Sequence, residues 1–236
     1  MYPLPVSEGV ILTCRVPVAP VSRTAAFSAE MTTQLLFGET CMVTGKPERK
    51  WYPVRCLYDG YEGYVLKSQF EEVPPAVLEQ PVMYTAEHGW LQTEQQRTLL
   101  PIGSVLTETQ ASGFSGAVLQ AGEWPFSAQH IIELAGRFLN TSYLWGGKSS
   151  FGIDCSGFTQ TIYRLLNISL PRDAWQQAEK GETIGFLQEA RTGDLAFFDD
   201  EEGRIIHTGI LLNDHEIVHA AGNVHIDPID HAGIPD

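Results

Sequence analysis

The spacing of apolar residues changes near residue 124, and this change constrains the fold more than any other feature of the chain. Before it, short runs rich in β-branched and aromatic residues alternate with glycine, proline and Asp-Gly turns, a pattern typical of strands. After it, Ile131, Leu134 and Phe138 recur at helical spacing. Ser127, just before them, is a good helix N-cap. The sequence therefore predicts an all-β N-terminal part and a C-terminal part that contains helices.

The first 73 residues predict a small β-barrel. Strands are expected over residues 9–17, 33–44, 51–58 and 61–66. The Asp59-Gly60 pair between two aromatic runs is a strong hairpin signal. Residues 34–39, Trp51 and the 59–64 hairpin resemble the bacterial SH3-like module. The paired prolines at 74 and 75 predict a linker.

The rest of the N-terminal half is less regular. Residues 77–122 are again rich in strand-forming residues, and they predict a second, degenerate SH3-like module; an extended insert packed on its neighbours is the alternative. The C-terminal part places helices before antiparallel strands at 193–198, 205–212 and 216–221, which predicts an α+β domain. The expected domains are residues 1–73, 74–123 and 124–236.

Charge and hydropathy limit the possible partners. Fifteen Lys and Arg residues stand against 29 Asp and Glu residues, so the net charge is −14, which argues against a nucleic-acid partner. No apolar run approaches the roughly 18 residues of a membrane-spanning helix, and no membrane partner is expected. Residues 1–8 do not resemble a signal peptide. We expect a cytoplasmic monomer, or a periplasmic or secreted protein if a signal peptide has been removed.

Four cysteines occur, and none belongs to a C-x-x-C pair that would suggest a structural zinc site. Cys14, Cys41 and Cys56 lie in apolar, strand-like stretches, and we expect them to be buried thiols. A disulfide between Cys41 and Cys56 is the alternative. Cys155 differs, because it follows a glycine-rich segment and begins a predicted helix.

Cys155 is a candidate nucleophile. Asp154 before it is a suitable N-cap, and Phe158 and Ile162 continue a helical pattern after it. The positive end of a helix dipole favours a thiolate over a thiol, so we expect this cysteine to be activated. A buried structural cysteine is the alternative.

A thiol nucleophile requires a base, and His207 and His219 are the candidates. Residues 213–215 predict a three-residue turn that pairs Gly209 with His219. In that register, His207 and His219 are diagonal neighbours on one face of a hairpin. His207 would accept the thiol proton, and His219 would fix its tautomer.

A metal site is the competing interpretation of these histidines. Its candidate ligands are His207, His215, His219 and His225. Their spacing matches no compact zinc motif. We therefore expect neither a metal nor another cofactor.

Several motifs together resemble the NlpC/P60 cysteine peptidases of the cell wall. They are YLWGG at residues 143–147, DCSG at 154–157, LPRD at 170–173, GDLAFF at 193–198, and His207 followed twelve residues later by HAAG at 219–222. The resemblance implies a papain-like catalytic domain preceded by one or two SH3-like barrels. It assigns Cys155 as nucleophile, His207 as general base and His219 as the third member of a triad. It places Tyr143 beside the cysteine and the Cys155 N–H in the oxyanion hole.

The resemblance also implies a substrate, the bond between γ-D-glutamate and a diamino acid in peptidoglycan stem peptides. Members with SH3-like modules resemble enzymes for short peptides with a free N-terminal L-alanine, in which a barrel closes one end of the cleft. The candidate substrate-binding residues are Tyr143, Asp154, Ser156, Tyr61, Glu39 and Arg172. Capping by Asp154, hairpin packing by Tyr61 and a surface ion pair of Arg172 are the structural alternatives.

Two other functions fit the same features. One is a non-catalytic peptidoglycan-binding protein whose third domain no longer turns over substrate. The other is an amidase or acyltransferase, because fold and triad do not fix the substrate.

Overall fold

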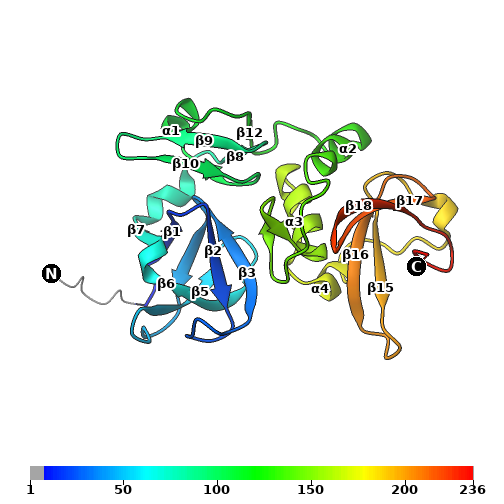
Figure 1. Cartoon of the computed structure of the whole chain (residues 1–236), viewed down its shortest axis with the longest axis horizontal. Helices are drawn as coiled ribbons and strands as arrows, with labels where there is room; N and C mark the ends of the chain where they lie inside the picture. The colour runs from blue at the N-terminus through cyan, green and yellow to red at the C-terminus, as the bar shows by residue number, and fades with distance from the viewer. Residues whose placement is uncertain (1–7, 236) are drawn as a thin grey trace. The chain divides into compact units, whose positions relative to one another are not determined.

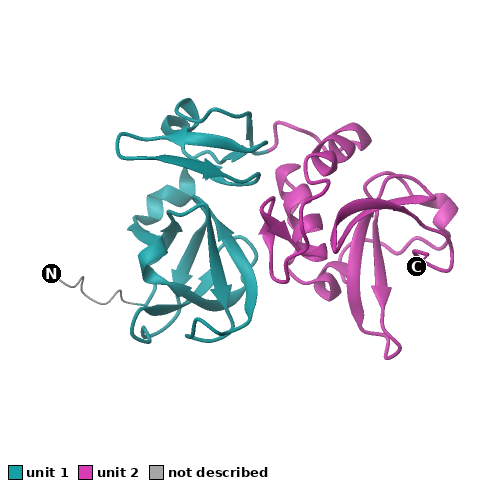
Figure 2. Cartoon of the chain, in the orientation of Figure 1, with its two compact units in different colours: residues 1–121 teal, residues 122–236 magenta. Residues whose placement is uncertain are grey.

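The computed structural model describes residues 8–235, and the chain divides into two compact units, Met1–Ala121 and Gly122–Asp236 (Figure 2). Residues 1–8, which do not resemble a signal peptide, lie almost wholly outside the described residues. Across residues 8–235, no helix has the length and apolar character needed to cross a membrane. The three domain boundaries expected from the sequence stay predictions.

The first unit begins with a seven-stranded antiparallel sheet in the order β3-β2-β6-β5-β4-β1-β7 (Figure 1). Its strands are β1 (Ile11–Cys14), β2 (Val18–Ser22), β3 (Met31–Leu36), β4 (Thr40–Val43), β5 (Trp51–Cys56), β6 (Glu62–Leu66) and β7 (Phe70–Val73). The predicted β5–β6 hairpin is confirmed. At its turn Gly60 takes a φ of +75°, and the Asp59 carboxylate accepts a hydrogen bond from the Tyr61 N–H at 3.0 Å. Strand β2 was not predicted, because Pro20 interrupts its pattern.

The cysteines of this unit lie in its apolar core. Cys14, Cys41 and Cys56 are buried thiols, as predicted. Cys41 on β4 lies directly opposite Cys56 on β5, but the two are not joined, so the alternative of a disulfide is wrong. Burial is the main reason that the pKa of Cys41 lies far above its ordinary value.

The remainder of the first unit forms two small sheets. They are a three-stranded sheet in the order β11-β8-β12 and a hairpin of β10 and β9. The elements are a 3₁₀ helix (Pro75–Glu79), β8 (Met83–Thr85), β9 (Gly89–Gln92), β10 (Arg97–Leu100), β11 (Val105–Leu106), α1 (Glu108–Ser112) and β12 (Val118–Gln120). Leu91, Leu100, Leu106 and Phe114 form their shared core. Whether this region is a degenerate SH3-like module stays a prediction.

The second unit confirms the predicted α+β fold. Its helices precede a four-stranded antiparallel sheet in the order β15-β16-β17-β18 (Figure 1). The elements are α2 (Ala128–Gly136), β13 (Lys148–Ser149), β14 (Gly152–Ile153), α3 (Cys155–Leu165), α4 (Ala174–Ala178), a 3₁₀ helix (Leu187–Glu189), β15 (Leu195–Asp199), β16 (Ile205–Leu211), β17 (Glu216–Ala221) and β18 (Asn223–Pro228).

Helix α3 is the centre of the second unit. Every residue from Cys155 to Leu165 is buried, and the helix packs against β16 and β17. Phe158 on α3 meets Phe138 in an edge-to-face contact, with ring centroids 5.8 Å apart. Ser127 caps α2 as predicted, because its hydroxyl accepts a hydrogen bond from the His130 N–H. This packing fixes the first residue of α3, Cys155, against the sheet.

Candidate active site

Cys155 is the first residue of α3, and the predicted cap before it is confirmed. One oxygen of the Asp154 carboxylate, Oδ1, accepts a hydrogen bond from the Gly157 N–H at 2.7 Å. The other oxygen, Oδ2, accepts one from the Gly146 N–H at 2.9 Å. The carboxylate therefore ties the glycine-rich approach to the start of the helix.

Glycine is required where the approach segment crosses the helix. A Cβ added to Gly157 would lie 2.2 Å from the carbonyl oxygen of Gly147, and one added to Gly147 would lie 2.5 Å from the carbonyl oxygen of Gly152. Gly146 takes a φ of +73°, a conformation that other residues rarely adopt. These contacts explain why glycine stands at both 147 and 157 around the candidate nucleophile.

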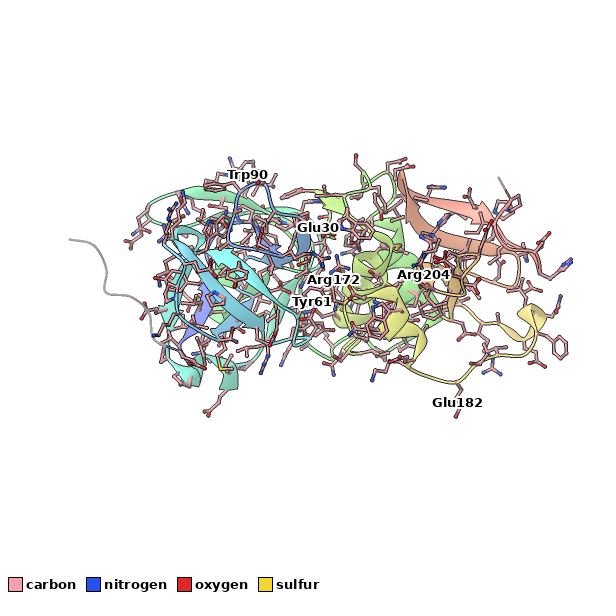
Figure 3. The ribbon with its side chains drawn as sticks, turned by 90° about the horizontal axis from the view of Figure 1, so that it is seen from below. Glu30, Tyr61, Trp90, Arg172, Glu182 and Arg204 are labelled. Atoms are coloured by element: carbon pink, nitrogen blue, oxygen red, sulfur yellow. The ribbon has the colours of Figure 1, made fainter. Side chains whose placement is uncertain are left out.

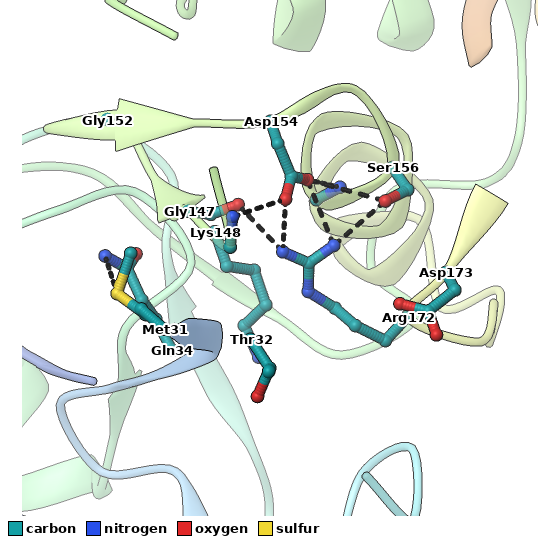
Figure 4. Close-up of polar contacts among 12 residues, drawn as sticks. Met31, Thr32, Gln34, Gly147, Lys148, Gly152, Asp154, Ser156, Arg172 and Asp173 are labelled. Carbon is teal, nitrogen blue, oxygen red and sulfur yellow. Dashed lines mark hydrogen bonds and ion pairs between the residues drawn. The ribbon is translucent and has the colours of Figure 1, made fainter. Parts of the chain in front are cut away.

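Arg172 is buried against Asp154 (Figure 4). Its Nη2 donates to Asp154 Oδ2 at 2.7 Å, and its Nη1 donates to Asp154 Oδ1 at 3.0 Å. Nη1 also donates to the Ser156 hydroxyl at 2.9 Å. The Arg172 side chain is only 1% exposed, so the alternative of a surface ion pair is wrong: the pair is buried and bidentate.

This ion pair occupies the groups predicted to recognise substrate. Both oxygens of Asp154 already accept from Arg172 and from backbone N–H groups, and the hydroxyl of Ser156 accepts from Arg172. The arrangement shows a structural role for Arg172, Asp154 and Ser156 at the base of α3. Their contact with substrate stays a prediction.

The Cys155 thiol is less acidic than its place at a helix N-terminus suggested. Burial is the largest cause, and the neighbouring Asp154 carboxylate acts in the same direction, so the pKa of Cys155 lies above its ordinary value. Hydrogen bonds from the backbone N–H groups of Thr208 and Ser156, and the charge of Arg172, lower it by less. Burial and the Asp154 carboxylate therefore oppose the effect that the helix N-terminus has on the pKa of this thiol.

Tyr143 lies beside the nucleophile. Its N–H donates to the Gly222 carbonyl at 2.8 Å, and the residue pairs with Ile153 in an isolated parallel bridge. Burial raises the pKa of Tyr143 to about 12, with further contributions from Cys155 and Asp154. The phenol therefore lies close enough to Cys155 for a negative charge on the sulfur to raise its pKa. It stays a neutral hydrogen-bonding group at neutral pH.

The predicted pairing of the two histidines is confirmed. Gly209 pairs with His219, and the Leu212 N–H donates to the Glu216 carbonyl across the turn. This register places His207 Nε2 2.8 Å from His219 Nδ1. Helix α3, which begins at Cys155, packs against β16, which carries His207. The backbone N–H of Thr208, the residue after His207, lies near enough to Cys155 to lower the pKa of its thiol. The nucleophile and both histidines therefore meet at one place in the second unit.

Asp227 extends this pair, and the sequence did not predict its role. Its Oδ2 lies 3.1 Å from His219 Nε2 and 2.9 Å from His225 Nε2. Burial favours the neutral acid, but the hydrogen bonds from His219 and His225 outweigh it, so the pKa of Asp227 lies below its ordinary value. An ionised Asp227 accepts the His219 Nε2 proton and leaves Nδ1 as an acceptor for His207.

The tautomer of His207 follows from this chain of hydrogen bonds. With His219 Nδ1 accepting, His207 Nε2 carries its proton, and Nδ1 is the nitrogen with a free lone pair. Burial is the largest reason that the pKa of His207 falls to about 4, followed by the charges of His219 and His225. His207 is therefore a neutral imidazole at neutral pH, as a general base must be.

Comparisons with known proteins agree with this geometry. A model of the NlpC/P60 family matches residues 140–235, and one described as the bacterial dipeptidyl-peptidase Sh3 domain matches residues 21–70. The γ-D-glutamyl-L-lysine dipeptidyl-peptidase of Bacillus subtilis is 32% identical over 213 residues, which cover 80% of this chain and 71% of that protein. The chain belongs to the NlpC/P60 family. It is a hydrolase of peptide bonds with an N-terminal SH3-like domain.

Other members are similar over different spans. A protein of the same name from Bacillus cereus is 36% identical over 112 residues, 45% of this chain and 33% of that protein. The crystal structure of an NlpC/P60 family protein from Bacillus cereus has the same fold, with a TM-score of 0.81 at 21% identity over 94% of this chain and 95% of that one.

Two predicted substrate residues of this NlpC/P60 peptidase lie in the first unit. Tyr61 is half-buried in the β5–β6 hairpin and packs against the barrel core. Glu39 is 3% exposed, and its Oε2 accepts a hydrogen bond from the Leu36 N–H at 2.7 Å, within the turn between β3 and β4. Both residues therefore have structural contacts inside the barrel. Their contact with substrate stays a prediction.

Proposed function

We propose that this chain is a cysteine peptidase that hydrolyses the bond between γ-D-glutamate and a diamino acid in peptidoglycan-derived peptides. The observation that carries the proposal is the 2.8 Å contact between His207 and His219 beside the buried Cys155. The Bacillus subtilis relative, a γ-D-glutamyl-L-lysine dipeptidyl-peptidase, supports this choice of bond.

The reaction uses the groups in a definite order. Nδ1 of His207 takes the Cys155 proton as the sulfur attacks the carbonyl carbon of the γ-glutamyl bond. The N–H of Cys155, at the N-terminus of α3, donates to the oxyanion. The His207 imidazolium then gives its proton to the leaving amine, and a thioester remains on the sulfur. Water, deprotonated by the same imidazole, attacks the thioester and releases the dipeptide.

His219 and Asp227 hold the base in the correct tautomer. Asp227 accepts from His219 Nε2, and His219 Nδ1 accepts from His207 Nε2. When His207 becomes charged, the positive charge lies next to a chain that ends in a carboxylate, which stabilises the imidazolium. Asp227 acts through His219 and is a positioning residue.

We further propose that the preferred substrate carries a free N-terminal L-alanine, as in short peptides released during cell-wall turnover. The match of residues 21–70 to a bacterial dipeptidyl-peptidase Sh3 domain supports this choice. Mass spectrometry on two peptides tests it: L-Ala-γ-D-Glu-meso-diaminopimelate with a free amine, and the same peptide with the amine blocked by a muramyl group. Cleavage of the free peptide alone supports the proposal, whereas equal cleavage of both contradicts the requirement for a free amine.

A non-catalytic binding protein and an acyltransferase were the alternatives from sequence. Membership of a peptidase family, with the histidine pair intact, argues against the first. An acyltransferase would pass the acyl group of the thioester to an amine, whereas a hydrolase passes it to water. If the chain is a hydrolase, an added amine should not compete with water for the dipeptide.

A further inference from the structure

Three side chains at the far end of the histidine pair point at one another. They are His219 on β17 and His225 and Asp227 on β18, and their ligand atoms all lie within 4.8 Å of one another. His219 and His225 are direct cross-strand partners, and Asp227 follows two residues later on the same face. Adjacent strands of one sheet therefore hold all three donors.

The distances suit a small divalent ion. Asp227 Oδ2 lies 3.1 Å from His219 Nε2 and 2.9 Å from His225 Nε2. A tetrahedral zinc site with bonds of about 2.0–2.1 Å has ligand atoms about 3.3 Å apart, so these two distances need to change by only a few tenths of an ångström. The two imidazole nitrogens lie within 4.8 Å of each other. Two imidazoles and a carboxylate are a common three-ligand set for Zn²⁺, with water in the fourth position.

The surrounding contacts orient the rings as metal sites require. A metal-bound histidine usually donates its second N–H to a carbonyl or another acceptor. His225 Nδ1 lies 2.9 Å from the Asn223 carbonyl, which directs its Nε2 to Asp227. His219 Nδ1 lies 2.8 Å from His207 Nε2, which can accept a proton from it when His207 changes tautomer. His225 and Asp227 are each about one third exposed, so an ion can reach the site from solvent.

We propose that His219, His225 and Asp227 bind Zn²⁺ or a similar divalent transition metal, and that the bound ion inhibits the peptidase. The ion takes the Nε2 lone pair of His219, so the proton of that ring moves to Nδ1. His219 then donates to His207 Nε2, and the His207 proton moves to Nδ1. The nitrogen that should accept the Cys155 proton is now protonated, and no proton is gained or lost overall.

The site differs from the metal site considered from sequence. His215 lies in the exposed turn and contacts Asp214 instead, and His207 is a neighbour of the ligands rather than a ligand. Asp227 completes the set. Metal binding does not depend on the proposed function, but the inhibition does.

A zinc titration by calorimetry tests the site with four proteins: the native chain, His225→Gln, His215→Gln and Cys155→Ala. The native chain, His215→Gln and Cys155→Ala should each bind one Zn²⁺ with similar affinity, and His225→Gln should bind at least about tenfold more weakly. His215→Gln is the matched control, because that ring also contacts an aspartate but has no third donor. Unchanged binding by His225→Gln, or loss of binding in Cys155→Ala, overturns the proposal.

Two further measurements make the result independent of how the variant folds. In NMR spectra of the native chain, Zn²⁺ should shift the ring resonances of His219 and His225 and leave those of His215 unchanged; the reverse pattern overturns the site.

Saturating Zn²⁺ should reduce native peptidase activity about 100-fold, the typical contribution of a general base. His225→Gln, relative to its own zinc-free rate, should resist the same concentration; equal inhibition overturns the mechanism. A chain without activity under any condition would contradict the proposed function, while the calorimetry would still decide the metal site.

Discussion

His207 and His219 contact each other ring to ring across adjacent strands, with Nε2 of the first 2.8 Å from Nδ1 of the second. The contact depends on the pairing of Gly209 with His219, since a shift of one residue would place the second ring on the opposite face of the sheet. The turn at residues 213–215 sets that register, and so it determines which histidine can act as a base.

Replacing Asp227 with Asn should lower kcat/KM by about 10- to 100-fold with little change in KM, because the amide can donate to His219 and favour the wrong tautomer. Steady-state kinetics on L-Ala-γ-D-Glu-L-Lys measures the effect. Asp214→Asn is the matched control, because Asp214 also contacts a histidine but lies in the exposed turn. Equal losses in the two variants would argue against a positioning role. Partial recovery in Asp227→Glu would support one.

Replacing Arg172 with Met should destabilise the second unit by about 3–5 kcal/mol, because it leaves the buried Asp154 carboxylate without its partner. Urea unfolding measures the loss. Arg204→Met is the control, since Arg204 is 71% exposed in its ion pair with Asp200 and should be replaceable with little effect (both arginines are labelled in Figure 3). If the two variants unfolded at the same urea concentration, the buried pair would not have the stabilising role assigned to it.

Replacing Gly157 with Ala should destabilise the chain by about 1–3 kcal/mol and reduce activity, because the new methyl group overlaps the Gly147 carbonyl at the start of α3. Gly136→Ala is the matched control at the end of α2, where no atom lies within 4 Å of an added Cβ. That change should be neutral or slightly stabilising. Thermal unfolding of both variants checks the difference, and a stable, fully active Gly157→Ala protein would contradict the packing described here.

The reactivity of Cys155 should depend on pH as a protonated thiol does. Because burial and Asp154 raise its pKa, we expect the sulfur to keep its proton through neutral pH and to lose it at alkaline pH. Iodoacetamide reacts with the thiolate, so its rate at Cys155 should be low from pH 5 to pH 7 and rise steadily above that range. A fast, pH-independent rate across the acidic and neutral range would show a thiolate already present at rest.

Much of this site could be predicted from sequence, because its signals are local. Asp154 caps the helix that follows it, and the 213–215 turn sets the pairing of its own two strands. Other features depend on contacts between distant segments. Arg172 lies 18 residues after Asp154 in the sequence, and neither residue alone indicates that the two form a buried ion pair.

The acidity of Cys155 and the role of Asp227 show the same limit. A helix N-terminus favours a thiolate, but burial by the sheet and the nearby carboxylate outweigh it, and only the packed structure reveals both. Strand β18 was not predicted, although His225 and Asp227 alternate within residues 223–228 as same-face residues of a strand do. That alternation was the sequence signal that could have identified Asp227 as a partner of His219.

The most direct test of the account is mass spectrometry of L-Ala-γ-D-Glu-L-Lys incubated with the native chain, Cys155→Ala and Cys56→Ala. Cys56 is an equally buried thiol in the other unit and controls for loss of a buried cysteine. We expect L-Ala-γ-D-Glu and free lysine from the native chain and from Cys56→Ala, and no product from Cys155→Ala. Cleavage that persists in Cys155→Ala, or an intact peptide with the native chain, would contradict it.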